Sequence, residues 1–129
     1  MPFIEMTVKK GLSTDHLTKC MKDLTNDAVE TLENVALRMV RVTVVEVEED
    51  YIRVGGEKPV GRFPVSIYFQ LGPGREKPSI MKCMDRMVST VSTDLSIPKE
   101  DVRLYINLIE GDQLAIGGKL KNFGPKKGN

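Results

Sequence analysis

The sequence predicts an α/β (α+β) domain in which two tandem β-α-β units form a four-stranded mixed sheet with two helices on one face. Three observations carry this prediction. Short motifs of the first half recur in the second half at a constant spacing, alternating apolar segments open and close each repeat, and an apolar stripe at helical spacing lies between them. A helix joins the two strands of one unit, so we expect these strands to be parallel with a right-handed crossover.

The repeat rests on several short motifs that agree in order and spacing. Three pairs share one spacing, namely Val-Arg-Val at 40–42 with Val-Arg-Leu at 102–104, Gly-Gly at 55–56 with 117–118, and Pro2 with Pro64. Lys-Cys-Met at 19–21 recurs at 82–84, one position further along. We therefore predict pseudo-repeats at 2–58 and 64–120, a linker at 59–63 and a mobile tail at 121–129 within a single domain.

In the first unit, residues 4–8 alternate between apolar and polar side chains, which is typical of a strand. Ser13 and Asp15 then supply a helix N-cap and a first-turn acid. The helical stripe is Leu17, Cys20, Met21, Leu24, Ala28 and Leu32. The pattern ends at Asn34, and a second strand is expected over about 39–47.

The second unit follows the same plan. Residues 65–71 alternate, a Gly-Pro-Gly segment at 72–74 ends the strand, and Pro78 suits the first turn of a helix. Its stripe is Ile80, Met84, Met87, Val88, Val91 and Leu95, and the closing strand covers 102–108. Because one unit of about 60 residues cannot cover its own apolar sheet face, we expect the two units to fold together.

Composition narrows the function classes. The chain has 129 residues, with 19 basic and 18 acidic side chains, so its net charge is only +1. That balance argues against non-specific binding to nucleic acid or to a membrane. Cys20 and Cys83 are too few for a disulfide scaffold or a zinc site and suit a reducing cytoplasm. No signal peptide or membrane-spanning stretch is apparent, so we expect a soluble cytoplasmic protein.

Met-Pro followed directly by a strand, an arginine in the second strand, and a closing Gly-Gly hairpin together resemble 4-oxalocrotonate tautomerase. The pattern occurs twice, so the chain resembles a fused, tandem form of that subunit. The layout is also similar to macrophage migration inhibitory factor and to the dehalogenase and decarboxylase branches of the tautomerase superfamily. The resemblance implies a homotrimer, a catalytic N-terminal proline, arginines that hold a small carboxylate substrate, and no metal or organic cofactor.

Pro2 is the candidate catalytic base, provided that Met1 is removed. A free N-terminal proline is a secondary amine, and the reference pKa of an α-amino group is only about 8. Burial and nearby arginines would lower that pKa further, so the amine can be neutral and accept a proton from carbon near neutral pH. Pro64 has its nitrogen in an amide and can be neither base nor nucleophile, which predicts one working site per chain.

Arg75, Arg41 and Arg103 are the candidate substrate-binding arginines. The resemblance matches Arg75 to an arginine that grips a substrate carboxylate, and Arg41 and Arg103 to one that holds the other end of the substrate. Guanidinium groups bind carboxylates in a bidentate manner. The alternative for each is a solvated charge or an ordinary ion pair. The sequence leaves open which subunit supplies each arginine and whether the trimer is symmetric.

The chain also departs from the family pattern. Leu12 stands where the second unit has Arg75, and Ile52 and Leu114 replace an aromatic residue before the Gly-Gly hairpin. Ile52 and Leu114 can still form an apolar wall of the substrate site. Arg53 has no counterpart in the second unit and is either a further binding group or a surface charge.

Three functions compete. The first is a tautomerase that moves a proton in small unsaturated 2-oxo or 2-hydroxy acids. The second is a cofactor-free hydratase, dehalogenase or decarboxylase on the same scaffold. The third is a non-catalytic trimeric interaction protein, which a retained Met1 would favour.

Overall fold

The computed structural model describes residues 2–121; Met1 and most of the expected tail, residues 122–129, lie outside the described residues. The first half contains strand β1 (Phe3–Lys9), helix α1 (Thr14–Thr31) and strand β2 (Arg41–Val47). The second half contains β3 (Val65–Leu71), α2 (Lys77–Leu95) and β4 (Val102–Leu108). A small terminal hairpin follows, formed by β5 (Ala115–Ile116) and β6 (Lys119–Leu120).

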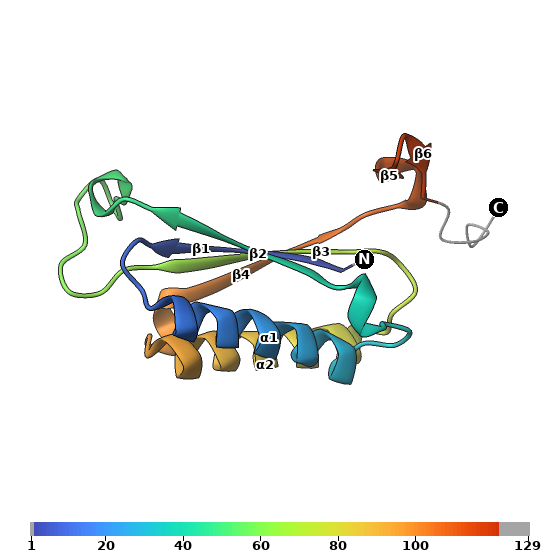
Figure 1. The fold of residues 1–129 in the computed structure, drawn as a ribbon, viewed down its shortest axis with the longest axis horizontal. Coiled ribbons are helices and arrows are strands. Elements are labelled where there is room, and N and C mark those ends of the chain that lie inside the picture. The colour runs from blue at the N-terminus through green and yellow to red at the C-terminus, as the bar shows by residue number, and fades with distance from the viewer. Residues whose placement is uncertain (1, 122–129) are drawn as a thin grey trace.

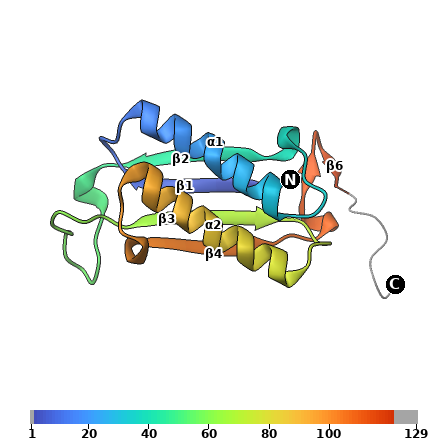
Figure 2. The same cartoon turned by 90° about the horizontal axis from the view of Figure 1, so that it is seen from below.

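The six longer elements form two layers. The strands lie in the order β2-β1-β3-β4, with β1 parallel to β2, β3 parallel to β4, and β1 antiparallel to β3. Both helices cover the same face of this sheet, which Figure 1 shows from the side and Figure 2 from the helical side. We call the other face, turned away from the helices, the outer face. The predicted fold class, a mixed four-stranded sheet with two helices on one face, is confirmed.

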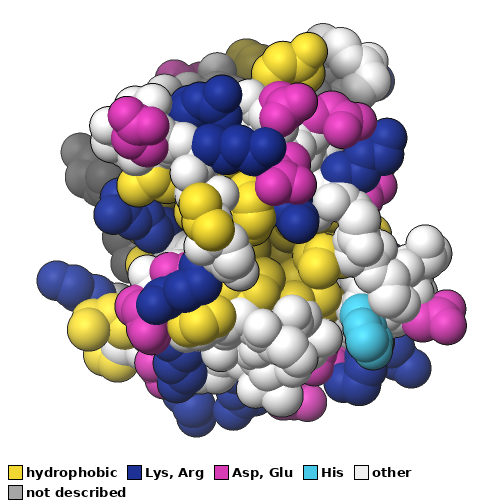
Figure 3. All heavy atoms as spheres, turned by 90° about the vertical axis from the view of Figure 1, so that its left-hand side faces the viewer, with side chains coloured by type: hydrophobic (Ala, Val, Ile, Leu, Met, Phe, Trp, Pro, Cys, Tyr) yellow, Lys and Arg dark blue, Asp and Glu magenta, His cyan; other side chains and the backbone are white. Residues whose placement is uncertain are grey.

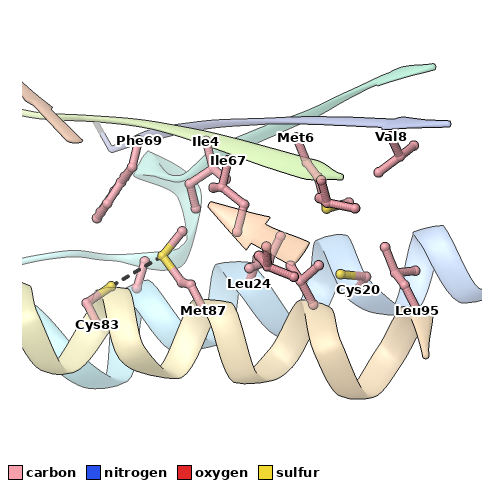
Figure 4. Close-up of a cluster of buried hydrophobic side chains, with 14 of the residues drawn as sticks. Ile4, Met6, Val8, Cys20, Leu24, Ile67, Phe69, Cys83, Met87 and Leu95 are labelled. Carbon is pink, nitrogen blue, oxygen red and sulfur yellow. Dashed lines mark hydrogen bonds between the residues drawn. The ribbon is translucent and has the colours of Figure 1, made fainter. Parts of the chain in front are cut away.

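The core lies between the sheet and the helices. Alternate side chains of the central strands are fully buried, namely Ile4, Met6 and Val8 on β1 and Ile67, Phe69 and Leu71 on β3. The helices contribute the predicted stripes, with Cys20 and Leu24 on α1 and Cys83 and Met87 on α2 fully buried (Figure 4). The period of two in the strands and of 3.6 in the helices therefore sends the predicted stripes into one core, except for Met21 on α1, which is only half-buried and lies outside that core.

Capping residues and backbone conformation explain where the two helices begin and end. The Ser13 hydroxyl accepts a hydrogen bond from the His16 backbone N–H at 3.3 Å, as an N-cap does. Pro78 lies in the first turn of α2, where a backbone N–H would have no acceptor within the helix, so the lack of this N–H in proline costs no hydrogen bond. α2 ends before Ser96, whose φ of 54° lies in the left-handed region.

The helices contact each other through polar groups as well as apolar ones. The Thr90 hydroxyl donates to the Asp27 carboxylate at 2.5 Å, and Arg86 pairs with Glu30 at 2.6 Å. Asp27 is only 6% exposed, and this burial raises the pKa of its carboxyl group. Asp27 is therefore a titratable group of this interface that has lost most of its hydration.

The strand register corrects one expected equivalence between the two units. Arg41 pairs with Phe3, whereas Arg103 pairs with Ser66, so the residue that corresponds to Pro2 is Val65. Buried core residues agree, since Ile4 matches Ile67, one position further along than the proline spacing implies. Pro64 thus corresponds to the position before Pro2, because the extra residue of the second unit precedes its strand. The nitrogen of Pro64 is still an amide, so its expected inertness is unaffected.

Two segment boundaries also differ from expectation. The second strand begins at Arg41 rather than at about residue 39, because Leu37–Met39 form a 3-10 turn. The expected hairpin near the first Gly-Gly pair is reduced to one bridge between Val54 and Glu57, whereas the second forms β5 and β6.

Candidate functional site

Pro2 lies at the beginning of the central strand β1. Its side chain is fully buried, and its carbonyl oxygen accepts a hydrogen bond from the Arg41 backbone N–H at 3.1 Å. Because β1 has a hydrogen-bonded neighbour on both sides, the backbone here is fixed in place. The fold thus holds position 2 rigidly at one end of the sheet, which we call the N-terminal end.

Arg41 lies next to Pro2 on the neighbouring strand. It pairs with Phe3, and its exposed side chain is on the outer face, since Val42 and Val44 pack into the core instead. Within residues 2–121 the Arg41 side chain forms no ion pair or hydrogen bond. Its guanidinium is therefore available to an anion near the start of β1.

Arg75 also lies at the N-terminal end but is already engaged. The β1-β3 register puts Leu71 opposite Pro2, and the guanidinium donates from Nη1 to the carbonyls of Gly72 and Pro73, both at 3.3 Å. Nε donates to the Glu33 carbonyl at 3.1 Å and Nη2 to that of Asn34 at 3.4 Å. Burial lowers the pKa of Arg75 from its ordinary value. Arg75 therefore ties the loop after α1 to the loop after β3.

Glu33, which the sequence patterns did not single out, lies in the same group. One of its carboxylate oxygens accepts from the Ser79 hydroxyl at 2.9 Å and from the Glu76 backbone N–H at 3.3 Å. Its other oxygen is buried and has no hydrogen-bond partner among the described residues. Hydrogen bonding, first to its own backbone N–H, lowers the pKa of Glu33. The Arg75 cation is thus partly balanced by a carboxylate.

The terminal hairpin lies at this end as well (Figures 1 and 2). Leu114 directly precedes β5, and its carbonyl accepts from the Lys121 backbone N–H at 2.6 Å. The structure therefore brings Pro2, Arg41, Arg75 and Leu114 to one end of the sheet.

Arg103 and Ile52 lie at the opposite end. Arg103 pairs with Ser66, which in turn pairs with Thr7, five residues along β1 from Pro2. At about 3.3 Å per residue this separates the two ends by about 17 Å, beyond the reach of one side chain. Within a single chain these two candidates cannot join Pro2 in one site.

The opposite end also carries a pocket of about 230 Å³. It is lined by Ile52, Arg53 and Pro64 together with hydroxyl side chains, among them Thr7 and Ser66. Viewed from this end, the surface is hollowed, with hydrophobic side chains at the floor and charged ones around them (Figure 3). The repeat alone did not predict this pocket; the one sequence signal for it was the unmatched Arg53.

No metal centre is formed by the part of the chain that the structure describes, where no three His, Cys, Asp or Glu side chains are placed to share an ion. Nor does any helix among residues 2–121 have the length and apolar character needed to cross a membrane.

No protein-family model matches the sequence, and no curated protein matches it. Solved structures do match the fold. A native fused 4-OT has a TM-score of 0.84 and 20% identity, over 92% of this chain and 95% of that one. A fused 4-OT described as a symmetric trimer has a TM-score of 0.81 and 22% identity, over 92% and 97%.

A member of the cis-3-chloroacrylic acid dehalogenase family is also similar, with a TM-score of 0.81 and 20% identity over 98% of this chain and 85% of that one. At these identities the likeness establishes the fold. The chain has the fused β-α-β fold of the tautomerase superfamily, as the resemblance in its sequence implied.

Proposed function

We propose that this chain is a tautomerase, an isomerase that uses Pro2 as a general base after removal of Met1. The observation that carries the proposal is the position of Pro2, held at the start of the central strand beside Arg41 and at the same end as Arg75. This arrangement puts a potential amine base and two cations at one end of a sheet.

The proposed chemistry is a proton transfer without a cofactor. The buried setting and the cationic neighbours both disfavour a protonated amine, so the pKa of the free Pro2 nitrogen would fall below the reference of about 8. The neutral amine takes a proton from carbon next to a carbonyl and returns it to another carbon or to oxygen. Such a positioned base typically contributes about 10²–10⁴ in rate.

The arginines recognise an acidic substrate in this proposal. Arg41 has a free guanidinium and is the first candidate to bind a carboxylate. Arg75 acts through its charge, which stabilises the developing enolate, because most of its N–H groups already donate to carbonyls. Leu114 supplies an apolar wall. The substrate class is a small unsaturated 2-oxo or 2-hydroxy acid.

Arg103 enters the site only if another subunit supplies it. Fused 4-OT relatives of the same fold are described as trimers, symmetric in one case and asymmetric in another. The outer face offers an interface, since Tyr68 and Tyr105 are stacked there at 5.4 Å and are 43% and 48% exposed. We propose a homotrimer in which Arg103, and also Ile52, approach the Pro2 end of a neighbouring chain.

The proposed setting is the reducing cytoplasm, where the two free cysteines, Cys20 and Cys83, would stay unpaired. Both are buried in the core, and burial raises the pKa of the Cys20 thiol to about 12, so it is not a nucleophile.

A second reaction is favoured by the similarity to a cis-3-chloroacrylic acid dehalogenase family member. In that case Pro2 would be protonated and would assist the addition of water to an unsaturated or halogenated acid, or a decarboxylation. A panel containing dienols, haloacrylates, acetylenic acids and malonate semialdehyde separates this reaction from tautomerisation. The third possibility, a non-catalytic trimer, is the outcome if no member of the panel turns over.

The test is enol ketonisation by wild type, Pro2→Ala and Pro64→Ala, with the intact mass of each protein measured first. Loss of the mass of one methionine is required. We expect Pro2→Ala to lose about 10²–10⁴ in kcat/KM and Pro64→Ala to match wild type. Equal rates for wild type and Pro2→Ala would overturn the proposed base.

A further inference from the structure

We propose that Glu33 is a positioning residue of the candidate site, whose carboxylate binds the start of α2 and thereby fixes the Arg75 guanidinium at the Pro2 end of the sheet. The inference rests on the proposed function, in which Arg75 stabilises the developing enolate. It adds a residue that acts through Arg75 and transfers no proton itself. Glu33 lies in the loop directly after α1.

Glu33 and Arg75 each bind the backbone segment that carries the other. The Glu33 carboxylate accepts from the backbone N–H of Glu76, which directly follows Arg75, at 3.3 Å. It also accepts from the Ser79 hydroxyl at 2.9 Å. In the other direction, the Arg75 guanidinium donates to the Glu33 carbonyl at 3.1 Å and to the Asn34 carbonyl at 3.4 Å. The two sets of bonds support each other, so a shift of either segment weakens both.

The Glu33 carboxylate takes the place of a side-chain cap on α2. Helix α1 is capped by its own Ser13, whereas the N-cap residue of α2, Glu76, forms no side-chain cap bond. The N–H groups at the start of α2 therefore need an acceptor from elsewhere, and a carboxylate is favoured at this positive end of a helix. Because the acceptor comes from the end of α1, it fixes the start of α2, and with it Arg75, relative to that loop.

The loop after α1 presents two successive carbonyls, those of Glu33 and Asn34, to the Arg75 guanidinium. Asn34 has a φ of 57°, in the left-handed region that asparagine adopts more readily than most residues. Burial lowers the pKa of Arg75, and the charge of the nearby Glu33 carboxylate opposes that effect. Glu33 therefore supports both the position of this guanidinium and its positive charge.

The pair of Glu33 and Arg75 occurs at only one of the two pseudo-equivalent ends of the described chain. In the register of the buried core, Leu12 corresponds to Arg75 and Ser96 corresponds to Glu33, since both pairs have the spacing of the two buried cysteines. The other end thus lacks both the cation and the carboxylate that holds it. The two residues occur together at the end that carries the proposed amine base, as expected if they act together there.

The test is the rate at which the Arg75 Nε–H exchanges with water in ¹⁵N-labelled full-length protein, its signal being identified by its loss in Arg75→Lys. This N–H donates to the Glu33 carbonyl, so its exchange reports how firmly the guanidinium is held. We expect Glu33→Ala, which removes both hydrogen bonds of the carboxylate, to speed exchange by about tenfold. Glu33→Gln keeps an acceptor oxygen and should stay within about twofold of wild type.

Two further variants separate positioning from general stability. Ser79→Ala removes one hydrogen bond of the Glu33 carboxylate and should speed exchange by about threefold, which keeps the inference testable if Glu33→Ala does not fold. Ser13→Ala removes the side-chain cap at the far end of α1 and is the matched control. It lowers the stability of a helix in the same way but should leave the exchange of the Arg75 Nε–H unchanged.

Ketonisation by the same variants tests the consequence for the proposed site. Because Arg75 acts on charge that develops in the transition state, Glu33→Ala should lower kcat by about tenfold with little change in KM, and Glu33→Gln should restore kcat.

Four results would overturn the positioning role of Glu33. They are unchanged exchange in both Glu33→Ala and Ser79→Ala, an equal rise in Ser13→Ala, no rescue by Glu33→Gln, and faster exchange at an unchanged kcat. Faster exchange in Glu33→Ala beside a wild type that turns over no substrate would support the hold of Glu33 on Arg75 and contradict the proposed function instead. The exchange measurement needs no substrate, so the two failures are distinguishable.

Discussion

Pro2 and Arg103 lie at opposite ends of one sheet. Pro2 precedes the first residue of β1, whereas Arg103 pairs with Ser66, whose own partner on β1 is Thr7. The strand rise of about 3.3 Å per residue keeps the two apart by about 17 Å within a chain. A site that uses both residues must therefore be built from two chains.

This separation predicts subunit complementation. Pro2→Ala and Arg103→Ala are each expected to lose activity as pure proteins, because one lacks the base and the other the distant arginine. After unfolding and refolding as an equal mixture, about a quarter of the sites should combine an intact Pro2 with an intact Arg103. We expect ketonisation to return to roughly that fraction of the wild-type rate. Absence of any recovery in mixed oligomers would contradict a shared site.

Arg75 is predicted to affect stability and activity together. Arg75→Leu removes hydrogen bonds to carbonyls of Gly72, Pro73, Glu33 and Asn34 and leaves the Glu33 carboxylate without its neighbouring cation. We expect the free energy of unfolding to fall by about 1–3 kcal/mol and kcat/KM to fall as well. Urea denaturation and ketonisation kinetics measure the two effects. A loss of activity at unchanged stability would instead indicate that Arg75 serves the substrate alone.

Two methionines of α2 provide a matched test of the core. Met87 is fully buried against the sheet, whereas Met81 is 59% exposed on the same helix. Met87→Ala should lower the free energy of unfolding by about 2–5 kcal/mol, because it removes buried surface and leaves a cavity. Met81→Ala should change it by no more than about 0.5 kcal/mol. Urea denaturation at one fixed protomer concentration measures the free energy of unfolding of both variants. Similar losses in the two would contradict the placement of Met87, and not Met81, in the core.

Asp27 gives the fold a pH dependence with a definite sign. Its pKa is raised, first by burial and then by the carboxylates of Asp23 and Glu30, against the hydrogen bond from Thr90 and the charge of Arg86. The folded protein therefore holds this proton more tightly than the unfolded chain. The contribution of Asp27 to the free energy of unfolding is fully present when the pH is below the ordinary pKa of 3.8. It is lost as the pH rises through the pKa that Asp27 has in the folded protein.

Asp27→Asn keeps an acceptor for Thr90 but cannot ionise. Relative to wild type, its stability should therefore increase as the pH is raised from about 3 to about 7. Urea midpoints of both proteins across that range measure the difference. A difference that stays constant or shrinks would show that the carboxyl group titrates normally.

The sequence predicted the layers of this fold because burial dictates them directly. Strands with a period of two and helices with a period of 3.6 can bury Ile4, Leu24 or Met87 in only one way, so the stripes were visible before the structure. The equivalence of Pro2 with Pro64 was wrong by one position, since proline spacing says nothing about which face a side chain takes. The core residues recur at a spacing one residue wider than that of the two prolines, as Cys20 and Cys83 already do in the sequence. This wider spacing gives the correct register.

The arrangement of the candidate site was less accessible from sequence. Which end of the sheet holds Arg103 depends on the antiparallel pairing of β1 with β3, which repeated motifs do not specify. The partners of Arg75 are backbone carbonyls, and these have no sequence signature at all. The pocket beside Arg53 arises where the segment after β2 meets the end of the linker and the start of β3, a contact between parts of the chain that no local pattern links.

The proposed base is the nitrogen of Pro2 and not the pyrrolidine ring as such. One alanine inserted between Met1 and Pro2 converts that nitrogen to an amide and leaves the proline side chain and the sheet in place. The ketonisation rate of this protein beside wild type, after loss of Met1 from each is verified by intact mass, isolates the amine. We expect kcat/KM to fall by about 10²–10⁴ in the extended chain; equal rates in the two proteins would contradict the assignment of Pro2 as the base.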